Sequence, residues 1–182
     1  MGTLPILLNN PKILLIGGGK IALHKARILA KNGIEFSIIT AKCTADLAAL
    51  NIPCTIKPLE PCDIDNFQIV IDATGNSAVA EIVLKKKITH NILFNCVDQP
   101  ELCDFFFSSL LNYGNLKIAV STDGLSPTIG QEVRDRIATI IPAEIEQMVT
   151  SKGIERERGI VDTKLTRQQC QQLFAATSHF FT

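Results

Sequence analysis

Apolar and polar residues follow a regular succession along the first hundred positions, in which short apolar runs separate longer helix-like stretches. Four runs are rich in β-branched residues and bounded by turn-forming ones, and they cover residues 12–16, 35–39, 68–72 and 91–97. Near-continuous apolar strands that alternate with helices are typical of a parallel sheet covered on both faces. The pattern therefore predicts an α/β fold with a Rossmann-like parallel sheet.

Two helices are expected between these strands. Residues 20–32 place apolar side chains on one helical face, and Gly33 follows as a common helix-ending residue. The residues of that inward face are Ile21, Ala22, Ala26, Ile28 and Leu29. The second helix would cover residues 76–88, with Asn76 as its N-cap.

The succession changes after Pro100. Two strands joined by a tight turn are expected next, the second over residues 116–121, and a helix begins near Pro127 because proline fits the first helical turn. Pro142 marks another break, after which the sequence is polar and helical. We therefore expect three parts, which are a sheet domain over residues 1–112, an α+β segment over 113–146 and a small helical domain over 147–182.

Composition limits the classes of partner. The chain has 182 residues, of which 46% are hydrophobic and 20% charged, and its formal net charge is zero. A zero balance gives no general attraction to nucleic acid or to anionic lipid, so neither is an expected partner. No apolar run reaches the about 18 residues that cross a bilayer, and the N-terminus lacks the basic start of a secretory leader. A cytoplasmic protein without a membrane partner is expected.

The first strand runs directly into Gly17-Gly18-Gly19, and a helix follows. Gly17, Gly19 and Ala22 satisfy the dinucleotide-binding pattern G-x-G-x-x-A. Gly17 permits a tight turn, Gly19 lets the backbone approach a pyrophosphate, and Ala22 lets the helix pack close to the strand. The amides and the positive dipole of the helix N-terminus favour an anion. This loop predicts a dinucleotide-binding site.

The residues after the second strand do not choose between NAD and NADP. An acidic residue that holds the ribose hydroxyls is expected about 20 positions after the glycine loop. The sequence has Thr40-Ala41-Lys42 there instead, and these three residues are candidate cofactor contacts. Lys42 fits the 2′-phosphate of NADP, although an exposed loop lysine without a ligand is the more common case.

The third strand ends in Ala73-Thr74-Gly75-Asn76. Small residues at this point would let the ribose and nicotinamide pass over the carboxyl edge of the sheet, where ligands of open α/β sheets bind. Thr74 and Gly75 are therefore candidate cofactor contacts.

Four segments in this order give the chain a family resemblance. They are Leu4-Pro5-Ile6, the glycine loop with Lys25-Ala26 after it, Asn95-Cys96-Val97-Asp98, and the run Ala119-Val120-Ser121-Thr122-Asp123-Gly124-Leu125-Ser126-Pro127. Together they resemble the precorrin-2 dehydrogenase / sirohydrochlorin ferrochelatase family, which also forms the N-terminal half of sirohaem synthases. The resemblance extends from Leu4 to about Pro142.

The resemblance implies an activity. Members of the family oxidise precorrin-2 to sirohydrochlorin with NAD⁺ as hydride acceptor, and many then insert Fe²⁺, which would be a transient substrate here. Asp98 takes the position of the family's general acid/base. Asp98 also follows an apolar strand at the edge where ligands bind, and a carboxylate there could accept the proton that dehydrogenation releases. The alternative for Asp98 is a turn-forming residue before Gln99-Pro100.

Further contacts follow from the same resemblance. It assigns nucleotide contacts to Lys20, Ile21, Ala41 and Lys42, and the family does not rely on an acidic residue after the second strand. Segment 113–146 would form a homodimer by exchanging strands and helices. The helical part after it would help to cover the tetrapyrrole.

The substrate is a polycarboxylate, so its site should be locally basic, and the candidates are Lys12, Lys20, Arg27, Arg156 and Arg158. The histidines at 24, 90 and 179 have no metal-ligand spacing, so no permanent metal site is expected. The six cysteines contain no C-x-x-C pair and are expected to be reduced, small apolar residues.

Three alternatives remain. A short-chain dehydrogenase would use the Tyr113-x-x-x-Lys117 spacing, but that pair needs one helical face and Gly114-Asn115 predicts a turn. A non-enzymatic dinucleotide-sensing module would keep the glycine loop without needing Asp98. Within the family itself, a dehydrogenase without chelatase activity is the third.

Overall fold

The structure is a computed structural model that describes residues 8–178. The Leu4-Pro5-Ile6 segment and His179 lie outside the described residues. The chain divides into two compact units between Phe106 and Phe107, and each is described by itself. The division falls ahead of the expected boundary at residue 112, because the strand that contains residue 112 pairs within the second unit.

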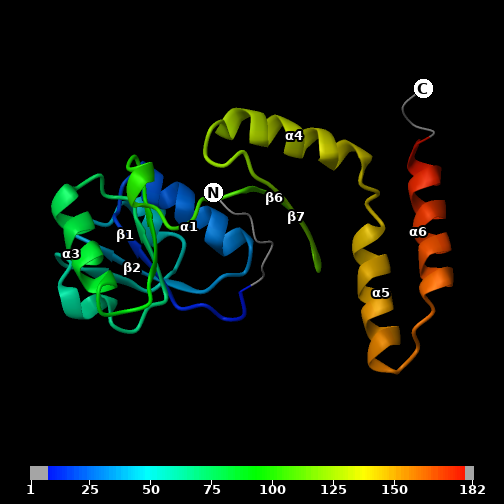
Figure 1. Ribbon diagram of the computed structural model, residues 1–182, viewed down its shortest axis with the longest axis horizontal. Helices are drawn as coiled ribbons and strands as arrows, with labels where there is room; N and C mark the ends of the chain where they lie inside the picture. The colour runs from blue at the N-terminus through cyan, green and yellow to red at the C-terminus, as the bar shows by residue number, and fades with distance from the viewer. Residues whose placement is uncertain (1–7, 179–182) are drawn as a thin grey trace. The chain divides into compact units, whose positions relative to one another are not determined.

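The first unit is built on a five-stranded parallel sheet with the strand order β3-β2-β1-β4-β5 (Figure 1). Its strands are β1 (Ile13–Ile16), β2 (Phe36–Thr40), β3 (Cys54–Ile56), β4 (Ile69–Asp72) and β5 (Leu93–Cys96). The predicted Rossmann-like α/β fold and its four apolar strands are confirmed. β3 is an additional edge strand that was not predicted. It has only three residues, none of them fully buried, so the sequence needs no continuous apolar run there.

Three α-helices and one 3₁₀ turn connect these strands, and a second 3₁₀ turn follows the last strand. They are α1 (Lys20–Lys31), α2 (Ala45–Ala48), η1 (Pro61–Ile64), α3 (Ser77–Lys87) and η2 (Pro100–Leu102). Figure 1 shows α1 and α3 on opposite sides of the sheet. Asn76 caps α3 as predicted, since its side chain accepts a hydrogen bond from the amide of Ala78 at 3.0 Å. Gly33 follows α1 with a φ of +67°, as a helix-ending glycine does.

The buried face of α1 differs from the predicted face at three positions. Its buried residues are Ala22, Leu23, Ala26 and Leu29. Ile21 is 42% exposed, since it lies in the first turn and Leu23 takes its place beside the sheet. The prediction was therefore wrong for Ile21, Ile28 is only half-buried, and Leu23 was missed.

The core of the first unit lies on both faces of the sheet. Leu14 and Val70 face the layer of α3, whereas Leu15 and Ile71 face the other side, and all four are at most 1% exposed. Truncating such a side chain to alanine costs about 2–5 kcal/mol of folding free energy. The central strands are thus fixed in place, and so are the loops at their ends.

Strand register brings four loops to one edge of the sheet. Ile16 pairs with Ile39 on one side and with Asp72 on the other, and Asp72 pairs with Cys96. The carboxyl ends of β1, β2, β4 and β5 therefore meet at one level, and the loops that follow them share one edge.

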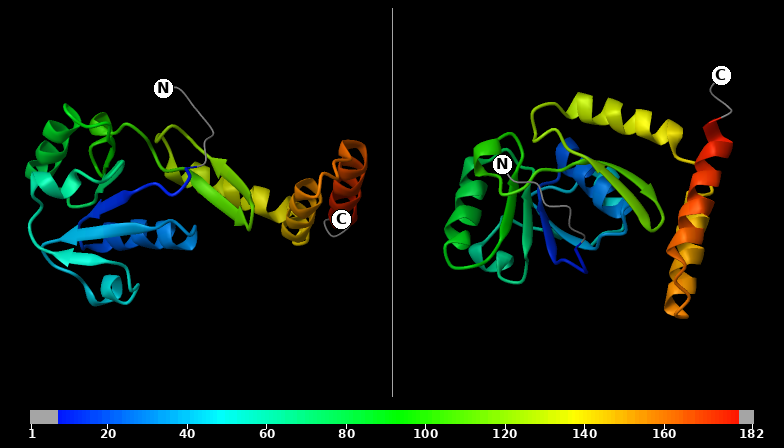
Figure 2. Two further views of the ribbon diagram at one scale, coloured as in Figure 1. Left: turned by 90° about the horizontal axis from the view of Figure 1, so that it is seen from below. Right: turned by 45° about the vertical axis from the view of Figure 1, so that its right-hand side comes forward.

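The second unit begins with an antiparallel hairpin of β6 (Ser109–Tyr113) and β7 (Leu116–Val120). Helices α4 (Pro127–Ile140), α5 (Ile145–Glu157) and α6 (Thr163–Ser178) follow. Ser126 caps α4 by accepting a hydrogen bond from the amide of Ile129 at 3.3 Å. Both views in Figure 2 show α5 and α6 side by side. The predicted hairpin, proline-started helix and helical end are confirmed. Within the described residues, no helix has the length and apolar character to span a membrane.

Candidate functional site

The glycine loop after β1 is packed tightly against its neighbours. Gly17 has a φ of +122°, and a Cβ added to it would lie 3.0 Å from the carbonyl oxygen of Ala73. A Cβ on Gly18 would lie 2.0 Å from the carbonyl oxygen of Lys42. Apart from Gly19 itself and its two chain neighbours, no atom of the described residues lies within 4 Å of a Cβ built on Gly19. Gly17 and Gly18 are therefore required by the protein's own packing, whereas Gly19 faces open space.

The N-terminus of α1 is open to an anion. Gly19 is its N-cap, no side chain of the described residues caps it, and its first turn contains no acidic residue. The first amides of a helix have no partner within the helix, and its dipole places positive charge at the same end. Lys20 and Ile21 of this turn are exposed, and Ala22 is fully buried beneath it. The geometry suits a phosphate group beside Gly19.

A cavity of about 620 Å³ lies at this edge of the sheet. Six of the predicted cofactor contacts line it, namely Gly17, Gly19, Thr40, Ala41, Lys42 and Thr74. Lys20, Ile21, Ala22 and Gly75 belong to the same loops but are not part of its lining. Small-molecule sites commonly have volumes of about 300–1,000 Å³, so the cavity has room for a cofactor.

The loop after β2 is fastened by Thr40. Its hydroxyl donates to the carbonyl oxygen of Lys42 at 3.0 Å and accepts from the amide of Lys42 at 3.3 Å. These bonds hold the Lys42 carbonyl over Gly18. Sequence reasoning left Gly18 out of the candidate residues, because the glycine pattern leaves that position free.

The cavity is lined by two lysines and, among the described residues, by no carboxylate. Lys57 pairs with Asp63 at 2.7 Å and with Glu60 at 3.0 Å, and these partners raise its pKa above the ordinary value. Lys42 forms no ion pair within the described part of the chain. Lys42 is thus the cation of this lining that is available to a ligand.

A hydrogen-bonded turn follows β4. Asp72 is 1% exposed, and its Oδ1 accepts hydrogen bonds from the amide of Thr74 at 2.8 Å and from its hydroxyl at 2.6 Å. The Thr74 hydroxyl accepts in turn from the amide of Asn76 at 3.1 Å. Burial raises the pKa of Asp72 above its ordinary value, against the opposing effect of these hydrogen bonds. Asp72 was not among the predicted site residues, although an aspartate that ends an apolar strand is a signal for it.

Asp98 lies in the turn after β5. Its side chain is exposed, and its φ of +67° is in the left-handed region, as in a turn-forming aspartate. Asp98 is not part of the cavity lining, but its strand is the neighbour of β4, so it lies at the same edge of the sheet. The structure is therefore compatible with both interpretations of Asp98.

Hydrogen bonds join the two ends of the loop that carries Asp98. The amide of Cys96 donates to the sulfur of Cys103, and the Cys103 thiol donates to the carbonyl oxygen of Cys96, both at 3.2 Å. Asp104 accepts from the amide of Phe94 at 2.7 Å and donates its own amide to the Phe94 carbonyl oxygen at 2.7 Å. Lys87 also pairs with the Asp104 carboxylate, so the loop is anchored to the sheet and to α3. No local pattern in the sequence indicates this role of Cys103.

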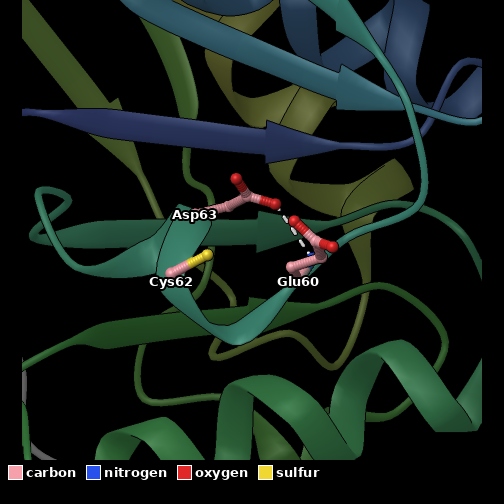
Figure 3. Close-up of side chains that lie close together, drawn as sticks. All are labelled: Glu60, Cys62 and Asp63. Carbon is pink, nitrogen blue, oxygen red and sulfur yellow. Dashed lines mark hydrogen bonds between the residues drawn. The ribbon is translucent and has the colours of Figure 1, made fainter.

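One group of potential metal ligands occurs in the described residues: Glu60, Cys62 and Asp63, whose ligand atoms lie within 4.8 Å of one another (Figure 3). The Asp63 carboxylate accepts a hydrogen bond from the Glu60 amide at 2.9 Å, as in a capping box of η1. Lys57 pairs with both carboxylates. Local structure therefore explains the group, since the charge of Lys57 takes the place that a metal ion would have.

The second unit has a cavity of about 480 Å³ between α5 and α6. Lys152, Arg156 and Arg167 contribute its basic side chains. Arg156 is one of the expected basic candidates, whereas Arg158 is not part of the lining. In the same unit, Tyr113 ends β6 and Lys117 lies on β7, so the pair is not on one helical face and the short-chain dehydrogenase alternative is excluded.

Comparisons with known proteins identify both parts of the chain. Residues 4–109 match the family model described as "Putative NAD(P)-binding", and residues 114–139 match the model "Sirohaem biosynthesis protein central". The "Siroheme synthase" of Methylococcus capsulatus is 34% identical over 164 residues, which cover 87% of this chain and 35% of the relative. The protein of the same name from Methylobacillus flagellatus is 36% identical over 163 residues, with 86% and 35% covered.

This chain spans about a third of the length of these relatives. A solved structure described as "SirC, precorrin-2 dehydrogenase" matches with a TM-score of 0.74 and 20% identity, over 94% of this chain and 88% of that one. At this level of identity, the structural match shows that the two chains share a fold.

Proposed function

Because the chain belongs to the family described as "Putative NAD(P)-binding", we propose that its first unit holds NAD⁺ and that the protein oxidises precorrin-2 to sirohydrochlorin. The observation that carries the proposal is the cavity in which Gly19 faces open space at the uncapped start of α1. The relatives named siroheme synthase and the fold shared with a precorrin-2 dehydrogenase support the choice of substrate.

The residues of the cavity fit a dinucleotide. A pyrophosphate beside Gly19 would accept hydrogen bonds from the first amides of α1, and the helix dipole would stabilise its charge. Lys42, a cation of the cavity lining, would contact the ribose next to the pyrophosphate. Thr74 and Gly75 would contact the cofactor from the loop after β4, which the hydrogen bonds between Asp72 and Thr74 hold in place. When bound, NAD⁺ supplies a hydride acceptor.

Oxidation also releases a proton, and Asp98 is the residue that we assign to accept it. Asp98 follows β5 at the edge of the sheet that carries the cavity, and the bonded loop from Cys96 to Cys103 holds it there. Its exposed carboxylate is free to receive a proton and pass it to water. A polycarboxylate substrate would also need basic contacts, for which Lys12, Lys20, Arg27, Arg156 and Arg158 remain candidates.

Anaerobic incubation of the protein with precorrin-2 tests the proposal, with NAD⁺ and NADP⁺ in parallel. We expect sirohydrochlorin absorbance and reduced nicotinamide to appear together and in equal amounts, with NAD⁺ as the better acceptor. Dinucleotide binding without turnover of precorrin-2 would instead favour the sensing module.

Insertion of Fe²⁺ into sirohydrochlorin is a second candidate activity, supported by the similarity to proteins named siroheme synthase. The iron would be a substrate, and Asp98 could accept a pyrrole proton as metal enters. Incubation of sirohydrochlorin and Fe²⁺ with and without the protein tests this step. If iron insertion is no faster with the protein than without it, the protein is a dehydrogenase without chelatase activity.

We also propose that the protein is a homodimer formed through residues 113–146. Helix α4 and the turn before it expose a row of apolar side chains, with Leu125 88%, Ile129 59%, Val133 42% and Ile140 56% exposed. The spacing of four and seven residues between Ile129, Val133 and Ile140 places these three on one face of α4, and Leu125 lies in the turn before the helix. A face of this kind is typical of a surface that is covered in an oligomer.

A further inference from the structure

Asp72 is a buried carboxylate without a cationic partner. It ends β4 in the middle of the sheet, between Ile16 of β1 and Cys96 of β5, and it is 1% exposed. No lysine, arginine or histidine of the described residues forms an ion pair with it. Buried charges in proteins are normally paired, so this exception needs an explanation.

The hydrogen bonds around Asp72 are those of an ionised carboxylate. The Thr74 amide can only donate, and the Thr74 hydroxyl donates to the same carboxylate oxygen. The Cys96 thiol lies 3.9 Å from Oδ2 and is a third donor. Burial raises the pKa of Cys96 to about 11, which keeps that proton on the sulfur. The donors favour the charged form of Asp72, although burial opposes it.

This charge lies next to the cavity. Thr74 lines the cavity, and its hydroxyl is hydrogen bonded directly to Asp72. Ala73, which also lines the cavity, follows Asp72 in the chain and packs against Gly17. The described lining itself contains no acidic side chain, so Asp72 supplies negative charge from beneath it. A charge surrounded by protein is screened less than a charge in water, so its field extends into the cavity.

We propose that Asp72 makes this site bind the oxidised form of the dinucleotide in preference to the reduced form. The oxidised nicotinamide ring carries a positive charge that the reduced ring lacks, and the two forms are otherwise almost the same in shape. A fixed negative charge at the carboxyl edge of the sheet therefore stabilises one form and not the other. The inference rests on the proposed binding of a dinucleotide. In a dehydrogenase, the preference would favour entry of NAD⁺ and release of NADH.

Calorimetric titration of the full chain with NAD⁺, NADH and ADP-ribose tests the inference. The variant Asp72→Asn keeps the shape of the side chain and an oxygen for the two Thr74 bonds, but it removes the charge. We expect the ratio of the Kd for NADH to the Kd for NAD⁺ to fall about fivefold in this variant. The affinity for ADP-ribose, which has no nicotinamide, is the internal reference. Asp46→Asn removes an exposed carboxylate from the same unit and should leave the ratio unchanged.

Each result of these titrations has a distinct meaning. If Asp72→Asn weakens all three ligands equally, Asp72 only shapes the Thr74 turn and the inference is wrong. If the unchanged protein binds none of the three, the proposed dinucleotide site itself is wrong. Asp72→Ser removes the same charge with a smaller side chain, and circular dichroism identifies the variant that folds. A ratio that stays at its original value in a folded variant overturns the inference.

Discussion

The carbonyl oxygen of Lys42 occupies the space that a side chain on Gly18 would need, since a Cβ there would lie 2.0 Å from it. The hydroxyl of Thr40 holds this carbonyl in place through the hydrogen bond at 3.0 Å. The loop after β2 and the glycine loop after β1 are thus packed backbone against backbone. Their contact forms one wall of the cavity before any ligand enters.

Replacing Gly18 should therefore destabilise the fold itself. We expect Gly18→Ala to lower the free energy of unfolding by about 2–3 kcal/mol, because one of two backbones must move. Urea unfolding followed by circular dichroism measures this change. Gly19→Ala is the matched control, since the space around that Cβ is open; because alanine is a poorer N-cap than glycine, it should lower stability by no more than about 1 kcal/mol. Equal losses in both variants would contradict the packing argument.

Gly19→Asp should separate stability from binding. Aspartate is a favourable N-cap, so capping α1 should add about 0.5 kcal/mol to the free energy of unfolding. The same carboxylate would take the place of the pyrophosphate and repel it, so the Kd for NAD⁺ should rise at least about tenfold. Thermal unfolding and calorimetry measure the two effects. An unchanged Kd would contradict the assignment of the pyrophosphate to the start of α1.

The sequence predicted the sheet well because its central strands are buried on both faces. Residues such as Leu14 and Val70 give continuous apolar runs, and continuous runs are the signal of a parallel sheet. β3 was missed because an exposed edge strand of three residues has no such run. Ile21 was assigned to the core by periodicity alone, which does not show where the sheet ends relative to the helix.

Local motifs also predicted the glycine loop and the cap at Asn76, because each depends on a few neighbouring residues. Gly18 and Asp72 depend on contacts between segments far apart in the chain, namely Lys42 for Gly18 and Cys96 for Asp72. Sequence spacing does not encode such contacts. The glycine pattern, the strand ends and the family resemblance therefore predicted residues that line the cavity, but missed the contacts that support them.

Asp98→Asn should separate the two roles of Asp98. Asparagine tolerates a positive φ as well as aspartate does, so the free energy of unfolding should change by less than about 0.5 kcal/mol. The formation of sirohydrochlorin should fall at least about 100-fold, because the proton acceptor is lost. Asp98→Gly is the second variant, which suits the turn even better and should be equally inactive. Full activity in Asp98→Asn would leave Asp98 as a turn residue only.

The apolar row on α4 predicts the effect of a charge placed within it. The chain has a mass of 19.9 kDa, and sedimentation equilibrium should give twice that mass for the unchanged protein. Ile129→Glu should give the single-chain mass, since a carboxylate would be buried in the interface. Gln131→Glu introduces the same charge on the other side of the helix and should remain dimeric. Identical masses for both variants would refute the proposed interface.

Asp72 should make the stability of the fold depend on pH in a defined direction. Burial raises its pKa in the folded protein above the ordinary value, so the folded state favours the protonated form more than the unfolded chain does. The stability that Asp72 contributes is present below the ordinary pKa of 3.8 and is lost as the pH rises through the raised value. The free energy of unfolding of Asp72→Asn, minus that of the unchanged protein, should therefore increase from pH 4 to neutral pH.

Asp63 provides a control of opposite sign for this measurement. Burial alone would raise its pKa, but the hydrogen bond from Lys57 and the amide of Glu60 bring it below the ordinary value. The stability that Asp63 contributes is therefore present above pH 3.8 and is lost as the pH falls through the lowered value. Urea unfolding of Asp72→Asn and Asp63→Asn at several pH values should give differences of opposite slope. A difference for Asp72→Asn that does not vary with pH would mean that folding costs its carboxylate nothing, and that the three donors compensate its burial fully.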